Sequence, residues 1–274
     1  MTNNPEQNNP EQNHIRAIHA FSDNFIWSIE SSAKKIGIIV DPGDATPVIN
    51  DYEKRGYTPH AILVTHSHSD HIGGICQLLR HWPGTPVYGP TKETIPELSQ
   101  ALAEGDEISF DSLGLNLSIM DVPGHTHGHI AFLGHFGHQP VLLCGDTLFS
   151  VGCGRIFSGS FNQLHDSLMR FNDLPDDTLV YCTHEYTLDN IGFAKWVEPD
   201  NKALLAREKE ALDLINSGKD TLPITLASEK ESNPFLRINQ PSVVQAAEAY
   251  AGRKMKNSQD TFQTLRTWKD TEYD

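Results

Sequence analysis

One segment restricts this chain more than any other feature of its sequence. Residues 65–74 spell THSHSDHIGG and follow the apolar run 61–64, which predicts a buried strand. Histidines two positions apart in an extended segment point to the same side, while Asp70 and His71 stand at the turn into a helix predicted over 74–82. Such a cluster of ligand-type side chains suits two adjacent cations better than one, and its strand-turn-helix context disfavours a histidine-rich surface loop.

Three further strand ends carry one ligand-type residue each. The apolar runs with the residues that follow them are 115–120 with His125, 141–144 with Asp146, and 179–182 with His184. Each of these side chains alone would be an ordinary loop residue, but together with 65–74 they predict a metal site on one rim of a sheet structure. Imidazole and carboxylate ligands suit Zn, Fe or Mn, and the lack of cysteine at these positions argues against a closed structural zinc site.

The charge of the chain excludes several functions. It carries 36 acidic and 21 basic side chains over 274 residues, a formal net charge of -15, so repulsion from phosphates disfavours nucleic-acid binding. No apolar run approaches the roughly 20 residues that a membrane span needs. The polar N-terminus has no secretory apolar region and the four cysteines form no closely spaced pair, so we expect reduced thiols and a cytoplasmic protein.

The pattern changes near residue 190. Residues 191–274 hold 12 of the 21 basic side chains, and short apolar runs between turns give way to helical periodicity over 200–217, 241–251 and 258–270. In the first of these helices we expect one apolar face, formed by Leu204, Leu205, Ala211, Leu212 and Ile215. We predict a disordered polar tail over 1–13, an α/β domain with two stacked sheets over 14–190, and a smaller helical domain over 191–274.

These motifs resemble the metallo-β-lactamase superfamily, whose hallmark is the HxHxDH run followed by later His, Asp and His ligands. More narrowly, the sequence is similar to the glyoxalase II (hydroxyacylglutathione hydrolase) family. Besides 65–74, the segments that carry the resemblance are 40–45 (VDPGDA), 145–149 (GDTLF), 152–155 (GCGR), 184–187 (HEYT) and 233–237 (NPFLR). The resemblance implies an αββα sandwich with a smaller C-terminal α-helical domain. By this resemblance, 14–190 would be the metallo-β-lactamase-like catalytic domain and 191–274 the substrate-binding domain.

The resemblance also implies a site with two divalent metal ions, expected to be Zn, with Fe or Mn as alternatives. One metal would be held by His66, His68 and His125, and the other by Asp70, His71 and His184. Asp146 and a hydroxide would bridge both metals, which makes Asp70 and Asp146 the implied catalytic side chains. By the same matching, Arg155, Tyr186, Arg266 and Lys269 would bind glutathione.

The implied reaction is hydrolysis of S-D-lactoylglutathione, an S-2-hydroxyacylglutathione, to D-lactate and glutathione by attack of the bridging hydroxide. This is a step of methylglyoxal detoxification, and we expect a monomer whose partner is the glutathione thioester. An alternative within the fold is a mononuclear iron dioxygenase that acts on glutathione persulfide. The sequence departs from a common form of the family pattern, since Arg155 stands for a lysine and Phe157 for a tyrosine that could donate a hydrogen bond.

Several polar residues keep two interpretations. Arg266 and Lys269 share a helix face that suits a ligand with two carboxylates, but with Asp270 nearby a solvated charged face is the simpler interpretation without the family match. Asp41 either orients a ligand histidine or serves only in a turn. His127 and His129 are undecided.

Overall fold

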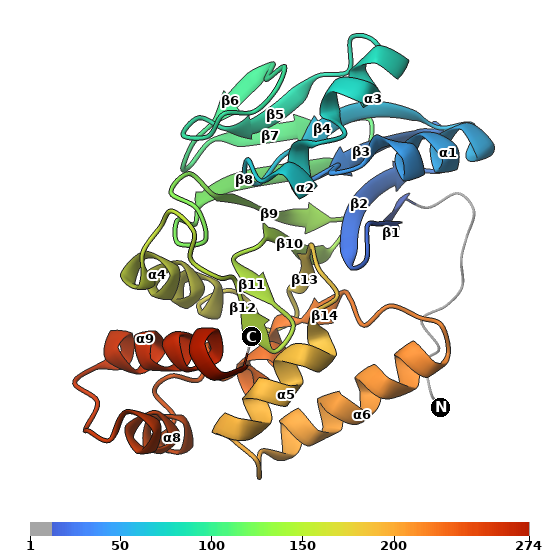
Figure 1. Cartoon of the computed structure of the whole chain (residues 1–274). Helices are drawn as coiled ribbons and strands as arrows, with labels where there is room; N and C mark the ends of the chain where they lie inside the picture. Colours follow the sequence, from blue (N-terminus) through green and yellow to red (C-terminus); the bar gives the residue numbers. More distant parts are fainter. Residues whose placement is uncertain (1–12, 274) are drawn as a thin grey trace.

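Two mixed sheets pack face to face in the computed structural model, which describes residues 13–273 (Figure 1). The first has six strands in the order β1-β2-β3-β4-β5-β6, and the second has six in the order β14-β13-β10-β9-β8-β7. The strands of the first sheet are β1 (Asn13–Ala20), β2 (Asn24–Ser31), β3 (Ile36–Val40), β4 (Thr58–Leu63), β5 (Val87–Pro90) and β6 (Gln100–Leu102). Those of the second are β7 (Glu107–Phe110), β8 (Leu115–Asp121), β9 (Ile130–Phe136), β10 (Gln139–Gly145), β13 (Leu179–Cys182) and β14 (Ile224–Thr225).

Helices cover the outer faces of both sheets (Figure 1). Those in the first half of the chain are α1 (Ala45–Arg55), α2 (Ser69–Ile72) and α3 (Ile75–His81), followed by α4 (Phe161–Asn172). The remaining ones are α5 (Thr187–Val197), α6 (Lys202–Asn216), α7 (Leu226–Ser232), α8 (Pro241–Ala251) and α9 (Ser258–Trp268), which continues as a π-helical turn over Lys269–Tyr273. A small hairpin of β11 (Leu148–Phe149) and β12 (Gly152–Cys153) lies beside the second sheet.

Alternation along the central strands separates two buried cores. In β4, Ala61 and Leu63 face the core between the sheets, whereas Ile62 packs in a second core with Val48 and Tyr52 of α1. The larger core continues from the sandwich into the C-terminal helices and includes Leu226, Phe235 and Phe262. The predicted sandwich with C-terminal helices is confirmed.

The predicted elements form where the apolar pattern placed them. Strands β3 and β13 and helix α8 have the predicted bounds, and α6 begins and ends within the predicted range. The apolar face predicted for α6 differs, because Leu204 and Ala211 are buried but Leu205, Leu212 and Ile215 are exposed, while the stem of Arg207 fills the interface instead.

Two observations bear on the predicted division of the chain. Strand β14 lies after residue 190 and still pairs with β13, Val180 opposite Ile224, so the C-terminal part extends the second sheet. Strand β1 begins at Asn13, one residue inside the predicted tail, and residues 1–12 lie outside the described part of the chain. The domain boundary near residue 190 stays a prediction. Within residues 13–273, no helix has both the length and the apolar character needed to cross a membrane.

Strand direction gathers the functional loops at one edge. Strand β10 is parallel to β13, and since β8 and β10 are each antiparallel to β9, all three run the same way. In the first sheet β3 and β4 are also parallel. Like-directed strands end at the same edge of their sheet, so the segments that follow β8, β10 and β13 meet those that follow β3 and β4.

A backbone and side-chain seam joins the two sheets at this edge. The indole Nε1 of Trp27, on β2, donates a 2.9 Å hydrogen bond to the carbonyl of Cys182 on β13. Next to it, the backbone N–H of Phe25 donates to the carbonyl of Thr183 at 2.8 Å. Trp27 is buried and its ring also packs edge-on against Tyr181, 4.9 Å between centroids.

Replacing Trp27 by alanine is therefore expected to lower the free energy of unfolding by about 3 to 5 kcal/mol, because it leaves a cavity and removes the bond between the sheets. Trp196 on α5 is 48% exposed, and Trp196→Ala should cost no more than about 1 kcal/mol. Guanidinium-induced unfolding of both variants measures the difference. Equal losses would contradict the role assigned to this seam.

Candidate metal centre

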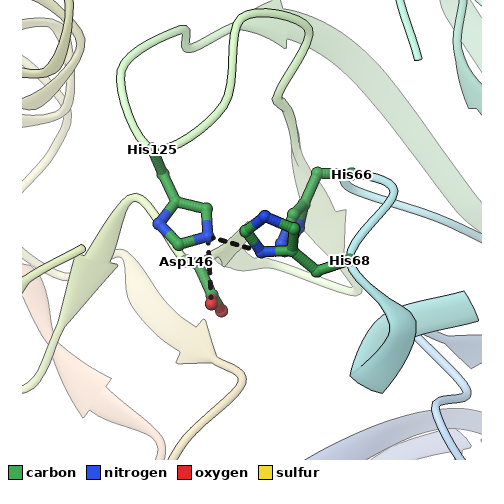
Figure 2. A group of neighbouring side chains, drawn as sticks. All are labelled: His66, His68, His125 and Asp146. Carbon is green, nitrogen blue, oxygen red and sulfur yellow. Dashed lines mark hydrogen bonds and ion pairs between the residues drawn. The ribbon is translucent and has the colours of Figure 1, made fainter. Parts of the chain in front are cut away.

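The first group of ligand-type side chains comes from three strand ends. His66 and His68 follow β4, His125 follows β8, and Asp146 follows β10, and one ligand atom from each lies within 4.8 Å of the others (Figure 2). His125 Nε2 is 3.0 Å from His68 Nδ1 and 3.4 Å from Asp146 Oδ2. Their nitrogens and oxygens thus converge on one point.

A second group lies beside the first. Its members are Asp70 and His71, at the start of the short helix α2, and His184, after β13, again with ligand atoms within 4.8 Å of one another. Asp70 Oδ2 is 3.5 Å from His71 Nε2 and 3.4 Å from His184 Nε2.

The Asp146 carboxylate connects the two groups. Its Oδ2 faces His125, while its Oδ1 lies 3.5 Å from His71 Nε2 and 3.6 Å from His184 Nε2. Thr183 Oγ1 donates a 2.5 Å hydrogen bond to the same Oδ1 and fixes its direction. One carboxylate oxygen is therefore aimed at each group.

The donor chemistry fits divalent cations. Among residues 13–273, the buried His66 Nε2 and His71 Nε2 have no hydrogen-bond partner, and an unsatisfied buried polar atom costs about 1 to 3 kcal/mol. Burial also lowers the pKa of His66 well below its usual value, so its ring is neutral and can coordinate. A cation in each group would satisfy these nitrogens, and the imidazole and carboxylate set suits Zn, Fe or Mn.

Neighbouring carboxylates raise the pKa of two histidines of the second group. Burial alone lowers the pKa of His184, but the carboxylates of Asp146 and Asp70 raise it to about 10. The same two carboxylates, together with Asp41, outweigh burial at His71 and raise its pKa well above the usual value. The site therefore attracts positive charge, whether as protons or as a metal ion.

The outer nitrogens of the histidines are held by neighbouring oxygens. His184 Nδ1 lies 2.8 Å from Asp23 Oδ1, in the turn before β2, and His125 Nδ1 lies 2.7 Å from the Arg155 carbonyl. His71 Nδ1 is 3.3 Å from Asp41 Oδ2, which is an ion-pair distance without a hydrogen bond. Such partners fix the ring orientation of a ligand histidine and favour coordination through its other nitrogen.

The carboxylate of Asp41 lies beside a predicted ligand histidine, as the first of its two interpretations expects. Its carboxylate faces His71 and also accepts hydrogen bonds from the backbone N–H (2.8 Å) and hydroxyl (2.7 Å) of Thr65. Two residues on, a Cβ at Gly43 would stand 1.9 Å from the backbone oxygen of Asp70, so only glycine allows this approach. The 40–45 segment thus packs directly against the 65–74 segment, which carries Asp70.

A cavity of about 370 Å³ opens onto both groups. It is lined by His68, Asp70, His125, Asp146 and His184 from the metal groups, and by the four predicted glutathione contacts Arg155, Tyr186, Arg266 and Lys269. The remaining lining residues include Phe149, Cys153 and Phe157. The structure therefore brings every predicted site residue to one cavity or directly beneath it.

Arg266 and Lys269 are not on a solvated face. They are 1% and 5% exposed, and Arg266 donates to the carboxylate of Asp270 at 2.8 Å and to the Cys153 carbonyl at 3.2 Å. Asp270 is also 3.4 Å from Arg155, whose side chain is half exposed. A single carboxylate thus lies between the buried and the accessible arginine.

Two aromatic rings flank the metal groups. The ring of Tyr186 stacks on His184 at 4.7 Å between centroids, and burial raises the pKa of its hydroxyl above the usual value, so it remains a hydrogen-bond donor. Phe157 is 64% exposed and packs edge-on against His68 and His125, at 4.9 and 5.2 Å between centroids.

Comparison with known proteins agrees with this architecture. Residues 25–184 match the metallo-β-lactamase superfamily model, and residues 185–272 match the model for the hydroxyacylglutathione hydrolase C-terminus. The chain is 49% identical over 253 residues to a hydroxyacylglutathione hydrolase of Nitrosomonas europaea, covering 92% of this chain and 94% of that protein. It is 48% identical to the one from Aeromonas salmonicida, covering 92% and 97%. The chain belongs to the hydroxyacylglutathione hydrolase family.

Solved structures share the fold more distantly. ETHE1 from Myxococcus xanthus superposes with a TM-score of 0.64 at 23% identity, covering 95% of this chain and 93% of that one. The BLEG-1 B3 metallo-β-lactamase gives 0.60 at 22% identity, covering 82% and 99%. These likenesses concern the fold alone and confirm the metallo-β-lactamase sandwich.

Sequence reasoning missed several residues that contact the predicted metal ligands. Asp23 precedes β2 and Asn24 is its first residue, and this strand was not predicted. Asp23 Oδ1 contacts His184 Nδ1, and Asn24 Nδ2 donates to Asp70 Oδ2 at 3.2 Å. Of the two undecided histidines, His127 is exposed, whereas His129 is buried, stacks on His66 at 4.6 Å and accepts from the Asp146 N–H at 3.1 Å. The assignment of the seven side chains as metal ligands stays a prediction.

The hairpin β11–β12 is fixed by a buried carboxylate. Glu229 on α7 accepts from the N–H of Val151 at 2.9 Å and from the side-chain amide of Asn233 at 2.8 Å. Asn233 in turn donates to the carbonyl of Gly152 at 2.9 Å. The 233–237 motif of the family thus positions the hairpin that contributes Phe149 and Cys153 to the cavity.

This carboxylate predicts a pH dependence of stability. Burial raises the pKa of Glu229 from about 4.5 to about 7, so between these values the folded chain binds more protons than the unfolded one. The contribution of Glu229 to the free energy of unfolding is largest below pH 4.5 and falls by about 3 kcal/mol as the pH rises through 7.

Glu229→Gln keeps an oxygen for Val151 and Asn233 but does not titrate. Denaturant unfolding of both proteins from pH 5 to 8 should show the wild type losing stability relative to this variant as the pH rises. Parallel stability curves would show that Glu229 does not titrate in this range.

Proposed function

We propose that this chain hydrolyses S-2-hydroxyacylglutathione thioesters, S-D-lactoylglutathione among them, to a 2-hydroxy acid and glutathione. The observation that carries the proposal is that two groups of predicted metal-ligand side chains lie at the same cavity as Arg155 and Tyr186. Relatives at 44–49% identity over nearly the whole chain are named hydroxyacylglutathione hydrolases, which supports the same reaction.

The proposed cofactors are two divalent cations, and Zn is the first choice for both positions. His66, His68 and His125 would hold one, Asp70, His71 and His184 the other, and Asp146 would contribute one oxygen to each. Cations in these positions would supply a water whose pKa is lowered from about 16 towards 7 and a positive charge near the thioester carbonyl.

The chain's own residues keep this site in one geometry. Thr183 fixes the Asp146 carboxylate, while Asp23 and the Arg155 carbonyl orient two of the histidine rings. No reorganisation of these groups is then needed during the reaction, which is the main source of electrostatic catalysis.

Glutathione is proposed to lie along the Arg155 side of the cavity. The half-exposed guanidinium of Arg155 suits a peptide carboxylate, and the protonated hydroxyl of Tyr186 suits a carbonyl. A thiolate leaves readily, so the reaction requires no strong general acid. Cys153 lines the same cavity, but burial raises its pKa to about 11, which leaves it a thiol and a poor nucleophile.

A cytoplasmic location remains part of the proposal.

Asp146→Ala removes the carboxylate shared by both groups. We expect the bound metal, measured by elemental analysis, and kcat for S-D-lactoylglutathione to fall together. The fall in kcat should be at least about 100-fold, because metal-site electrostatics supply several kcal/mol. Full activity with one metal per chain would refute the two-metal assignment. Oxygen consumption with glutathione persulfide, without thioester hydrolysis, would identify the dioxygenase instead.

Arg155→Ala tests the binding of the peptide part. Loss of a charged hydrogen bond of about 1.5 to 3 kcal/mol should raise KM for S-D-lactoylglutathione about 10- to 100-fold. Hydrolysis of a simple thioester that lacks the peptide should change little. Arg170→Ala, which removes an arginine paired with Glu104 away from the cavity, is the control. An equal loss on both thioesters would contradict the role of Arg155.

A further inference from the structure

One carboxylate outside the metal groups contacts both loops that build the first of them. Glu93 lies after β5, and its Oε2 accepts hydrogen bonds from the hydroxyl of Ser67 and from the Ser67 backbone N–H at 3.2 Å. Its Oε1 accepts from the Thr126 hydroxyl at 2.6 Å and from the Gly128 N–H at 3.0 Å. Four donors from two loops thus meet on one side chain.

The positions of these donors in the chain are informative. Ser67 stands between His66 and His68, and Thr126 directly follows His125. Since neighbouring side chains of an extended segment point in opposite directions, the histidines face the metal position while Ser67 faces Glu93. Glu93 therefore connects the 65–68 and 125–128 loops on the side away from the metal position.

The contact is close enough to require a particular residue on the facing loop. A Cβ at Gly128 would stand 2.6 Å from Glu93 Cγ, so a larger residue would push the two apart. The second metal group has other supports, namely Asp23 at His184, Asp41 at His71 and Asn24 at Asp70. In the described part of the chain, none of these supports involves Glu93.

We propose that Glu93 is a positioning residue that sets the spacing of the 65–68 and 125–128 loops, and so the affinity of the first metal position for a divalent cation without changing that of the second. The inference rests on the proposed function only in assuming that the site takes metal. It does not depend on the substrate.

A double-mutant design isolates the effect at each metal position. His184→Ala removes a ligand of the second group and leaves the first, and His125→Ala does the reverse. Glu93→Ala is added to each background, and Zn²⁺ affinity is measured by competition with a chelator. Loss of a residue that supports metal ligands costs about 10- to 100-fold in affinity, so we expect this loss in the His184→Ala background and none in the His125→Ala background.

A control separates positioning from general stability. Glu198 is a buried carboxylate that accepts from Arg237 at 2.8 Å and from Ser242 at 2.6 Å, far along the chain from the ligand loops. Glu198→Ala should lower Tm while leaving Zn²⁺ affinity unchanged in both backgrounds. An unchanged affinity on adding Glu93→Ala, equal losses in the two backgrounds, or the same loss from Glu198→Ala would overturn the proposal.

If Glu93→Ala does not fold, Thr126→Val decides the question, since it removes one donor to Glu93 with little change of shape. The expected result is a weaker first position, restored by Thr126→Ser, which retains the hydroxyl. Equal affinity in the valine and serine variants would count against the proposal. A chain that binds two Zn²⁺ ions normally but does not hydrolyse the thioester would refute the proposed function and leave this inference intact.

Discussion

The buried imidazoles at the shared edge of the two sheets are the constraint on which the rest of the structure depends. A buried ring nitrogen without a hydrogen-bond partner is costly in a protein interior, and His66 and His71 both present such a nitrogen. Asp41 and Thr65 support the segment around these histidines, Glu93 contacts Ser67 beside His66, and glycines let one loop approach another. A cation in each group would satisfy these nitrogens.

The same constraint explains how the C-terminal segment contributes to the cavity. The described part of this segment adds a two-residue strand to the second sheet, a buried carboxylate that holds the β11–β12 hairpin, and a helix end that brings Arg266 and Lys269 to the cavity wall. Because its apolar side chains join the core of the sandwich, these polar groups are fixed relative to the metal groups. An acidic chain can thus bring three basic side chains to one cavity.

The sequence predicted the side chains that converge in the two groups and missed much of their support, for a physical reason. His66, His125, Asp146 and His184 each follow a short apolar run, which marks the end of a buried strand. Asp23 meets His184 from 161 positions away, and Glu93 meets its loops from 26 to 35 positions away, so no local pattern connects them. Strand β2 was missed because Ser28 and Glu30 interrupt its apolar pattern, although both are buried against the arginines and tyrosine near α1.

The distribution of the metal-ligand side chains between the sheets has a consequence for how the protein unfolds. The side chains after β4 belong to the first sheet and those after β8, β10 and β13 to the second. A cation coordinated by side chains from both sheets would therefore cross-link the two halves of the sandwich. A ligand that binds only the folded state at 1,000 times its Kd adds about 4 kcal/mol to stability. Removing the metal would then lower the stability of the folded chain as well as its activity.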